Sequence, residues 1–325
     1  MKTINKTWIL FAGLMMMMSF SSCEDMALGE GFLQKPPSTD VTKDTIFGKA
    51  EYARRVLWRS YQYLPYGMET KGFWTQMCMS TIEGLTDLNY DNIGYSALSN
   101  TYYPGLYNAE DNTTINSHRT KMQFAQSGIW TGVRHAWLFH ANVDRVPDMD
   151  AQEKARLKAE AKMMVAVFYA HMLRHYGALP IIDHAISADD ATFPARATLQ
   201  ETVDFIIKLL DEAIAEKEFP WSIPETELEN WDGRMTKGGA MALKTRVLLF
   251  VASPLFNSDA PFANGKASEK KMTWFGGYDK NRWKQAVDAC KAFFDAMNAN
   301  GFYKLVEAGD KGIATKREAY TSAYF

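Results

Sequence analysis

The spacing of apolar residues constrains the fold of this chain more than any other feature. Along most of the sequence they recur three and four positions apart, which places them on one face of an α-helix. One such segment runs from Thr198 to about Glu216 and opens with Thr-Leu-Gln-Glu, a capping box whose threonine and glutamate bind free backbone N–H groups. No strand-like alternation of comparable strength is present. The sequence therefore predicts a mainly α-helical protein.

Further segments share this period and end at proline or glycine, the residues that stop a helix. They are residues 50–63, 129–143, 151–176, 237–252 and 283–300. Paired helices of roughly three to four turns are typical of helical repeats. The spacing of Trp283, Ala286 and Phe293 resembles one helix of a tetratricopeptide repeat, although no strict period of about 34 residues is present. The predicted fold is an all-α, tetratricopeptide-like helical-repeat scaffold with long loop insertions at 67–127 and 253–281.

The first residues have the pattern of a secretory signal. Two lysines precede an apolar run from Trp8 to Phe20, and two serines lead to Cys23. A cysteine at this place is typical of bacterial lipoprotein signals, in which it carries lipid and becomes the first mature residue. An ordinary signal peptide and an uncleaved anchor are the alternatives, but the run is shorter than the roughly 20 residues of a bilayer span. The predicted division is a signal peptide at 1–22, an extended tether at 23–46 and a helical domain at 47–325.

Composition argues against several classes of function. The formal charge of −2 at pH 7 becomes about −4 when residues 1–22, with two lysines and no acids, are removed. This balance provides no electrostatic footprint for nucleic acid, so no nucleic-acid partner is predicted. Besides Cys23, only Cys78 and Cys290 are present, which allows at most one disulfide and favours two buried thiols. Phosphate loops, nucleophile elbows and paired metal-spaced cysteines are absent, so no cofactor is predicted.

Two pairs of residues at helical spacing have a simple structural interpretation. His171 and His175 lie four positions apart, as in a zinc-binding helix, but the glutamate of that motif is missing. We therefore expect packing or capping, and no metal site. Arg156 and Glu160 are also four apart, and this spacing favours a solvated ion pair on one helix face.

Several short blocks of sequence follow one another in a fixed order. They are the lipoprotein start with Phe32-Leu33-Gln34-Lys35-Pro36-Pro37, then Ala141-Asn142-Val143, then Arg156, Glu160 and Lys162 leading to Tyr176-Gly177-Ala178-Leu179-Pro180-Ile181, then Gly233-Arg234-Met235-Thr236-Lys237 running to Ala252-Ser253-Pro254, and finally Trp283 with Ala286. Together they resemble the RagB/SusD family of Bacteroidetes outer-membrane nutrient-uptake lipoproteins.

The resemblance implies a tetratricopeptide-like protein that is lipid-anchored in the outer membrane. Acidic Glu24 and Asp25 after Cys23 resemble the surface-export signal of such lipoproteins, which implies exposure at the cell surface. Members capture glycans or peptides and pass them to a TonB-dependent transporter resembling SusC. Because members usually continue beyond this length, we expect the chain to be an N-terminal portion.

Aromatic and polar residues gather in the first insertion, where we predict the ligand site. Sugars present flat C–H faces and hydroxyl rims, so a carbohydrate site needs aromatic rings beside amides and carboxylates. The candidates are Trp74, Tyr90, Tyr95, Tyr102, Asn89 and Asp91, with a second edge at Trp274 and Tyr278. The alternative is that these rings attach long loops to the helices.

The leading hypothesis is a non-catalytic, surface-tethered protein that captures an oligosaccharide for a SusC-like transporter. The runner-up is a lipid-anchored α-helical glycoside hydrolase that uses acids such as Glu83 and Asp87. A third hypothesis is a repeat protein that only assembles other envelope proteins.

Overall fold

The computed structural model describes residues 42–64, 86–87, 90, 103–106, 127–187, 194–304, 306 and 313–324. Internal contacts divide the chain into Met1–Thr45 and Ile46–Phe325. Within the described ranges the secondary structure is helical, apart from an isolated bridge between Pro180 and Arg196. The helices are α2 (Lys43–Phe47), α3 (Ala50–Tyr61), α5 (Ser127–Asn142), α6 (Ala151–Tyr176), α7 (Leu199–Ala215), α8 (Leu228–Trp231), α9 (Lys237–Ala252), α10 (Lys266–Glu269), α11 (Lys280–Asn300) and α12 (Ile313–Tyr324), with short 3-10 helices η6 (Val143–Arg145) and η7 (Glu225–Glu227).

The long helices lie where the apolar period and the caps predict them. α6 and α9 have the predicted bounds, and the capping box at the start of α7 is formed. Thr198 Oγ1 accepts from the Glu201 N–H at 3.2 Å, and Glu201 Oε2 accepts from the Thr198 N–H at 2.8 Å. α2, α8, α10 and α12 were not predicted. α8 and α10 are single turns, too short for a periodic stripe.

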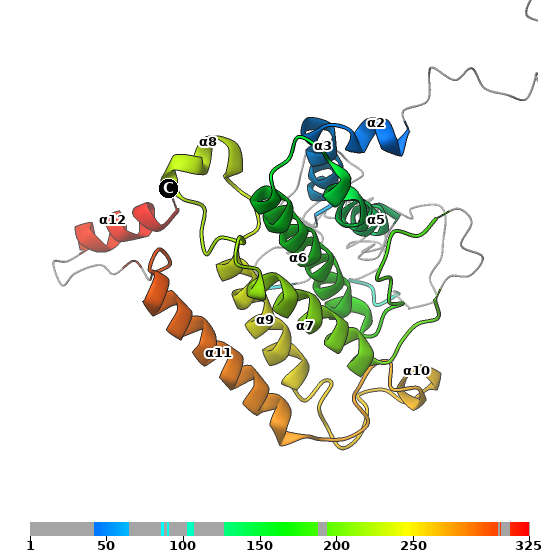
Figure 1. Cartoon of the computed structure of the whole chain (residues 1–325). Helices are drawn as coiled ribbons and strands as arrows, with labels where there is room; N and C mark the ends of the chain where they lie inside the picture. The colour runs from blue at the N-terminus through cyan, green and yellow to red at the C-terminus, as the bar shows by residue number, and fades with distance from the viewer. Residues whose placement is uncertain are drawn as a thin grey trace, which may run out of the picture. The chain divides into compact units, whose positions relative to one another are not determined.

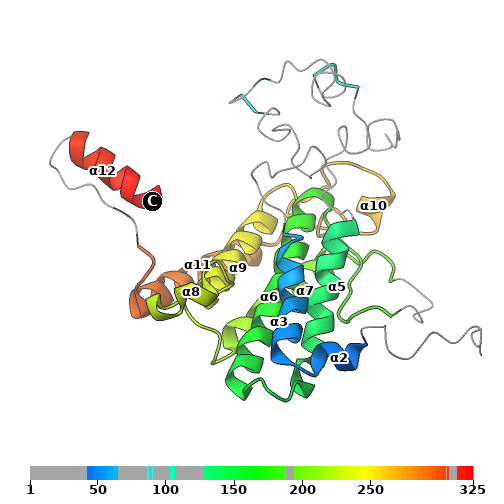
Figure 2. The ribbon, with the colours of Figure 1, turned by 90° about the horizontal axis from the view of Figure 1, so that it is seen from above.

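Each long helix packs against the next one along the chain. The order of neighbours is α3, α5, α6, α7, α9 and α11, and the two views of the ribbon show this succession (Figures 1 and 2). Successive antiparallel helices that contact mainly their neighbours form the architecture of a helical-repeat protein. The predicted tetratricopeptide-like, all-α fold class is thus confirmed.

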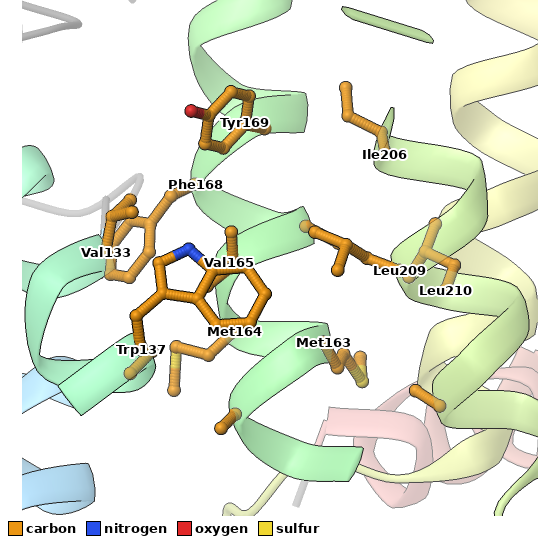
Figure 3. Packing of buried hydrophobic residues seen from close by; sticks show 14 of the residues in the cluster. Val133, Trp137, Met163, Met164, Val165, Phe168, Tyr169, Ile206, Leu209 and Leu210 are labelled. Atoms are coloured by element: carbon orange, nitrogen blue, oxygen red, sulfur yellow. The ribbon is translucent and has the colours of Figure 1, made fainter. Parts of the chain in front are cut away.

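The second half of α6 is the centre of the core. Met164, Val165, Phe168 and Tyr169 are fully buried although they point in different directions around the helix (Figure 3). A helix that is apolar on all sides is surrounded by other elements, here chiefly α5 and α7. α5 approaches α6 closely at Gly132, where an added Cβ would lie 2.5 Å from the Phe168 ring.

The prediction of a solvated Arg156–Glu160 pair is wrong. Glu160 is 1% exposed and accepts from Arg234 Nε at 2.7 Å and from the Tyr61 hydroxyl at 2.5 Å. Arg234 Nη2 lies 2.6 Å from the same carboxylate oxygen as part of the ion pair. Arg156 instead pairs with Glu227 at 2.7 Å. The segment between α8 and α9 supplies Arg234, so tertiary packing replaces the local partner with one 74 positions away. Burial raises the pKa of the Glu160 carboxyl, and the positive charge of Arg234 opposes that rise.

α11 keeps much of its apolar stripe at the surface. Ala286 is its buried residue, whereas Trp283, Val287 and Phe294 are 37%, 50% and 50% exposed. Cys290 is a partly buried free thiol on the same helix. The apolar period therefore predicted the helix correctly, but burial of such a face depends on which elements pack against it.

Candidate ligand-binding cleft

A cleft of about 520 Å³ opens between α5 and the segment that follows α6. Trp130, Thr131 and Arg134 line it from α5, and we call it the Trp130 cleft. The opposite wall consists mainly of proline, isoleucine and histidine side chains, from Pro180, Ile182, His184, Ile186 and Pro194. An apolar hollow with a few polar groups at its edge is the usual form of a small-ligand site.

The helical period of α5 directs Trp130 toward the cleft. Ile129 is buried in the core, whereas Trp130, Val133 and Arg134, three and four positions apart, share the side that lines the cleft. The Trp130 indole packs edge-on against the Tyr169 ring, with centroids 5.9 Å apart and planes at 88°. This contact holds a partly buried aromatic ring in one orientation, which lowers the entropy cost of stacking a ligand on it.

The far wall is tied to the core by specific hydrogen bonds. The Tyr169 hydroxyl donates to the Pro180 carbonyl at 2.8 Å and accepts from the Ile182 N–H at 2.8 Å. The Trp137 indole N–H donates to the Ile182 carbonyl at 2.8 Å. Burial raises the pKa of the Tyr169 hydroxyl, so it remains a donor throughout the physiological range. The cleft is consequently formed before any ligand arrives.

Polar groups surround the mouth of the cleft. The Arg134 guanidinium is exposed and donates through Nε to the Ile186 carbonyl at 3.3 Å. His184 Nδ1 lies 2.7 Å from an Asp183 carboxylate oxygen, and this hydrogen bond lowers the pKa of Asp183. The arrangement offers an aromatic face beside charged donors and acceptors, which suits a ligand with a flat apolar side and a polar rim.

The structure places only some of the predicted site residues. Tyr90 is 74% exposed and stacks on Tyr103, with centroids 4.9 Å apart and planes at 8°. Trp274 is partly buried and its indole N–H donates to the Ser268 carbonyl at 2.9 Å, whereas Tyr278 is 55% exposed. The remaining candidates stay predictions because they lie outside the described residues, namely Cys23, Trp74, Glu83, Asn89, Asp91, Tyr95 and Tyr102.

Trp130 is not among the predicted site residues, because it belongs to the apolar pattern of the predicted helix 129–143. The sequence contains one relevant signal. Trp130 lies beside Ile129 rather than three or four positions from it, so the stripe is wider than a single buried face needs. Its exposure depends on the segment after α6, which is about 50 positions away along the chain.

The His171 and His175 rings lie together near the end of α6, with centroids 5.2 Å apart. Burial lowers the pKa of each imidazole to about 4, so both are neutral at pH 7. In the described part of the chain, no cluster of three His, Cys, Asp or Glu side chains could hold a metal ion. The described helices include none that is long and apolar enough to cross a membrane.

Comparison with known proteins relates the fold to solved structures. No protein-family model and no curated protein matches the chain. A SusD-like protein from Bacteroides fragilis is 20% identical and matches 84% of this chain, with a TM-score of 0.54. A SusD-like carbohydrate-binding protein from the same species is 16% identical over 78% of the chain, with a TM-score of 0.52. A SusD homologue from Bacteroides thetaiotaomicron is 16% identical over 80%, with a TM-score of 0.51.

These matches cover 42%, 41% and 49% of the three solved proteins, respectively. The chain therefore spans less than half the length of each. This chain has the fold of the SusD-like proteins, as its sequence blocks predict.

Proposed function

We propose that this chain is a cell-surface glycan-binding protein that captures an oligosaccharide in the Trp130 cleft. The observation that carries the proposal is the Trp130 indole, held in place at an apolar cleft that Arg134 and the Asp183–His184 pair border. The C–H face of a pyranose would stack on the indole, and its hydroxyls would bond to the polar rim. The SusD-like fold and the name of one solved relative, a carbohydrate-binding protein, support this class of ligand.

Binding is favoured over hydrolysis at this cleft. Glycoside hydrolases place two carboxyl groups roughly 5 to 10 Å apart on either side of the bond that they cleave. Of the described residues that line the cleft, none is an aspartate or glutamate. Asp183 lies next to the lining residue Ile182, and its carboxylate is engaged by His184. We therefore propose a non-catalytic protein.

The cellular role follows from the N-terminal pattern and the resemblance. Lipidation at Cys23 would tether the protein to the outer membrane with the helical domain outside the cell. The captured oligosaccharide would then pass to a SusC-like TonB-dependent transporter. Palmitate labelling of the full chain, lost in Cys23→Ala, tests the anchor. Co-purification from outer membranes tests the transporter.

The binding test is calorimetric titration of the lipid-free protein with neutral oligosaccharides, followed in parallel by tryptophan fluorescence. We expect saturable binding that Trp130→Ala weakens about tenfold, since a stacking contact contributes about 1.5 kcal/mol. Trp283→Ala is the matched control, because Trp283 is a partly exposed tryptophan on α11 outside the cleft. Equal losses in both variants, or release of reducing sugar, would contradict the proposal. Binding to envelope proteins but to no glycan would favour an assembly role.

A further inference from the structure

A second cleft, of about 470 Å³, lies between α6 and α9 and carries two arginines. Arg174 reaches it from α6 and Arg246 from α9, so the guanidinium groups come from opposite walls. Its floor is apolar and includes Leu243, Val247 and Phe250. We call it the arginine cleft.

The two guanidinium groups have no counter-charge within the described structure. Both side chains are exposed, and neither forms an ion pair with any described residue. None of the described residues that line the cleft is acidic. His171, which also lines it, is neutral at pH 7 because burial lowers its pKa to about 4. Two positive charges above an apolar floor therefore favour an anionic ligand.

An adjoining cleft of about 330 Å³ shares Arg174 and has different chemistry. Tyr176 and Phe262, which are 40% and 87% exposed, provide aromatic rings. Asn264 and Thr273 contribute an amide and a hydroxyl. The described residues that line this cleft also include no acid. Aromatic rings beside neutral hydrogen-bonding groups suit a pyranose ring, as in the Trp130 cleft.

Backbone contacts fix the α9–α11 linker against the end of α6, where the two clefts meet. The Ala178 N–H donates to the Met272 carbonyl at 2.8 Å, which fastens the α9–α11 linker to the end of α6. Gly177 makes this approach possible, because its φ is +72° and an added Cβ would lie 2.7 Å from the Met272 oxygen. The Phe275 N–H donates to the Phe256 carbonyl at 3.0 Å in the same linker. Arg174 therefore sits at a rigid junction between the clefts.

We propose that the arginine cleft and the adjoining cleft together, here called the double cleft, bind an acidic oligosaccharide. One of its sugar rings would stack against Tyr176 and Phe262, and carboxylates along the oligosaccharide would pair with Arg174 and Arg246. The inference rests on the proposed glycan-binding function and adds a charge class to the ligand. A repeating uronate matches the site because it presents carboxylates at intervals along a chain of pyranose rings. The site lies apart from the Trp130 cleft, with which it shares no lining residue.

The test uses matched pairs of probes on the lipid-free protein. Oligomers of galacturonate, mannuronate and glucuronate are titrated beside their carboxyl-reduced, neutral counterparts. We expect at least one uronate to bind about tenfold more tightly than its neutral counterpart, because each charge-assisted pair adds to affinity. The preference should shrink when NaCl rises from about 0.05 to about 0.5 M, since exposed charges are screened.

Variants place the effect in the double cleft. The double variant Arg174→Gln, Arg246→Gln should abolish the preference for the uronate, while Arg55→Gln should retain it. Arg55 is the matched control because it is an exposed arginine paired with Glu51 on α3. Circular dichroism and the melting temperature verify that each variant is folded.

The outcomes separate this inference from the proposed function. Neutral glycans that bind through Trp130, with no uronate preferred over its neutral form, would overturn the inference alone. A preference that survives the double variant would also overturn it. Binding of an acidic peptide that depends on Arg174 and Arg246, without any uronate binding, would replace the ligand class. If no glycan of either kind binds, the proposed function fails as well.

Discussion

Removing Arg234 should destabilise the fold far more than removing an exposed arginine. Glu160 is 1% exposed and depends on Arg234 for two contacts of 2.7 and 2.6 Å. The variant Arg234→Met deletes the charge but keeps much of the side-chain volume, so it leaves a buried carboxylate without its cation. Breaking a buried pair in this way costs about 3–5 kcal/mol of the free energy of unfolding. Because the Arg234 side chain is 11% exposed, we expect about 3 kcal/mol.

The double variant Glu160→Leu, Arg234→Met tests the reason for that loss. An apolar replacement of both partners removes the desolvation cost together with the attraction, so the double variant should be more stable than Arg234→Met alone. Tyr61 limits the recovery, because its hydroxyl loses its acceptor on Glu160 while still accepting from the Met235 N–H at 3.1 Å. We expect a net cost of about 1–2 kcal/mol relative to the parent.

Urea unfolding, followed by far-ultraviolet circular dichroism, measures these differences. Arg55→Met is the control, since Arg55 and Glu51 form an exposed pair one helical turn apart and should contribute less than about 0.5 kcal/mol. If Arg234→Met lowers the free energy of unfolding by less than about 1 kcal/mol, the reasoning is refuted, because the loss of its cation should destabilise a buried carboxylate by more than that. A double variant less stable than Arg234→Met would refute the desolvation argument specifically.

Three further predictions concern local features of the fold. Thr198→Ala should lower the free energy of unfolding by about 1 kcal/mol in urea titrations, because it removes the α7 cap, whereas Thr198→Ser should retain it. Gly132→Ala should cost about 2 kcal/mol or more, since its Cβ would lie 2.5 Å from the Phe168 ring. Gly239→Ala should cost less, because its Cβ would come no nearer than 3.3 Å to its neighbours, Met163 Cε and Thr236 Oγ1. Burial lowers the pKa of His140 from 6.5 to about 4. As the pH falls, His140 is therefore protonated in the unfolded chain at a higher pH than in the folded protein. Stability should fall by about 1 kcal/mol between pH 6.5 and 4, after allowance for a partly exposed ring, and His140→Gln should remove that part of the pH dependence.

α6 connects the features on which the proposed ligand sites depend. Its buried Glu160 joins α3 to the segment before α9, its Tyr169 holds Trp130 and the wall of the Trp130 cleft, and its Arg174 reaches the arginine cleft. A helix that is buried on nearly all sides is rigid, so it holds the side chains at its ends in defined positions. The long helices thus provide a scaffold, and the segments between them supply the walls of each cleft.

Much of the fold could be predicted from local patterns. The apolar period, the capping box at Thr198 and the proline or glycine stops act within a few residues, so they predicted the bounds of α6 and α9. The packing of each long helix against the next one along the chain also agrees with the predicted helical-repeat scaffold. The candidate site was harder to predict from the sequence. Of the predicted ligand residues, the structure describes Tyr90, Trp274 and Tyr278.

Tertiary structure decided which side chains are buried and which partners they have. Glu160 pairs with Arg234 rather than with Arg156 because packing brings a segment 74 positions away over α6. Trp130 borders a cleft and is not fully buried, because the segment after α6 forms the opposite wall of that cleft. The neighbouring residues in the sequence decide on which face of a helix a residue lies. The element that packs against that face decides whether the residue is buried and which partners it has. The sequence alone therefore determined the long helices and their order, and only the packing of distant segments created the clefts and the buried ion pair.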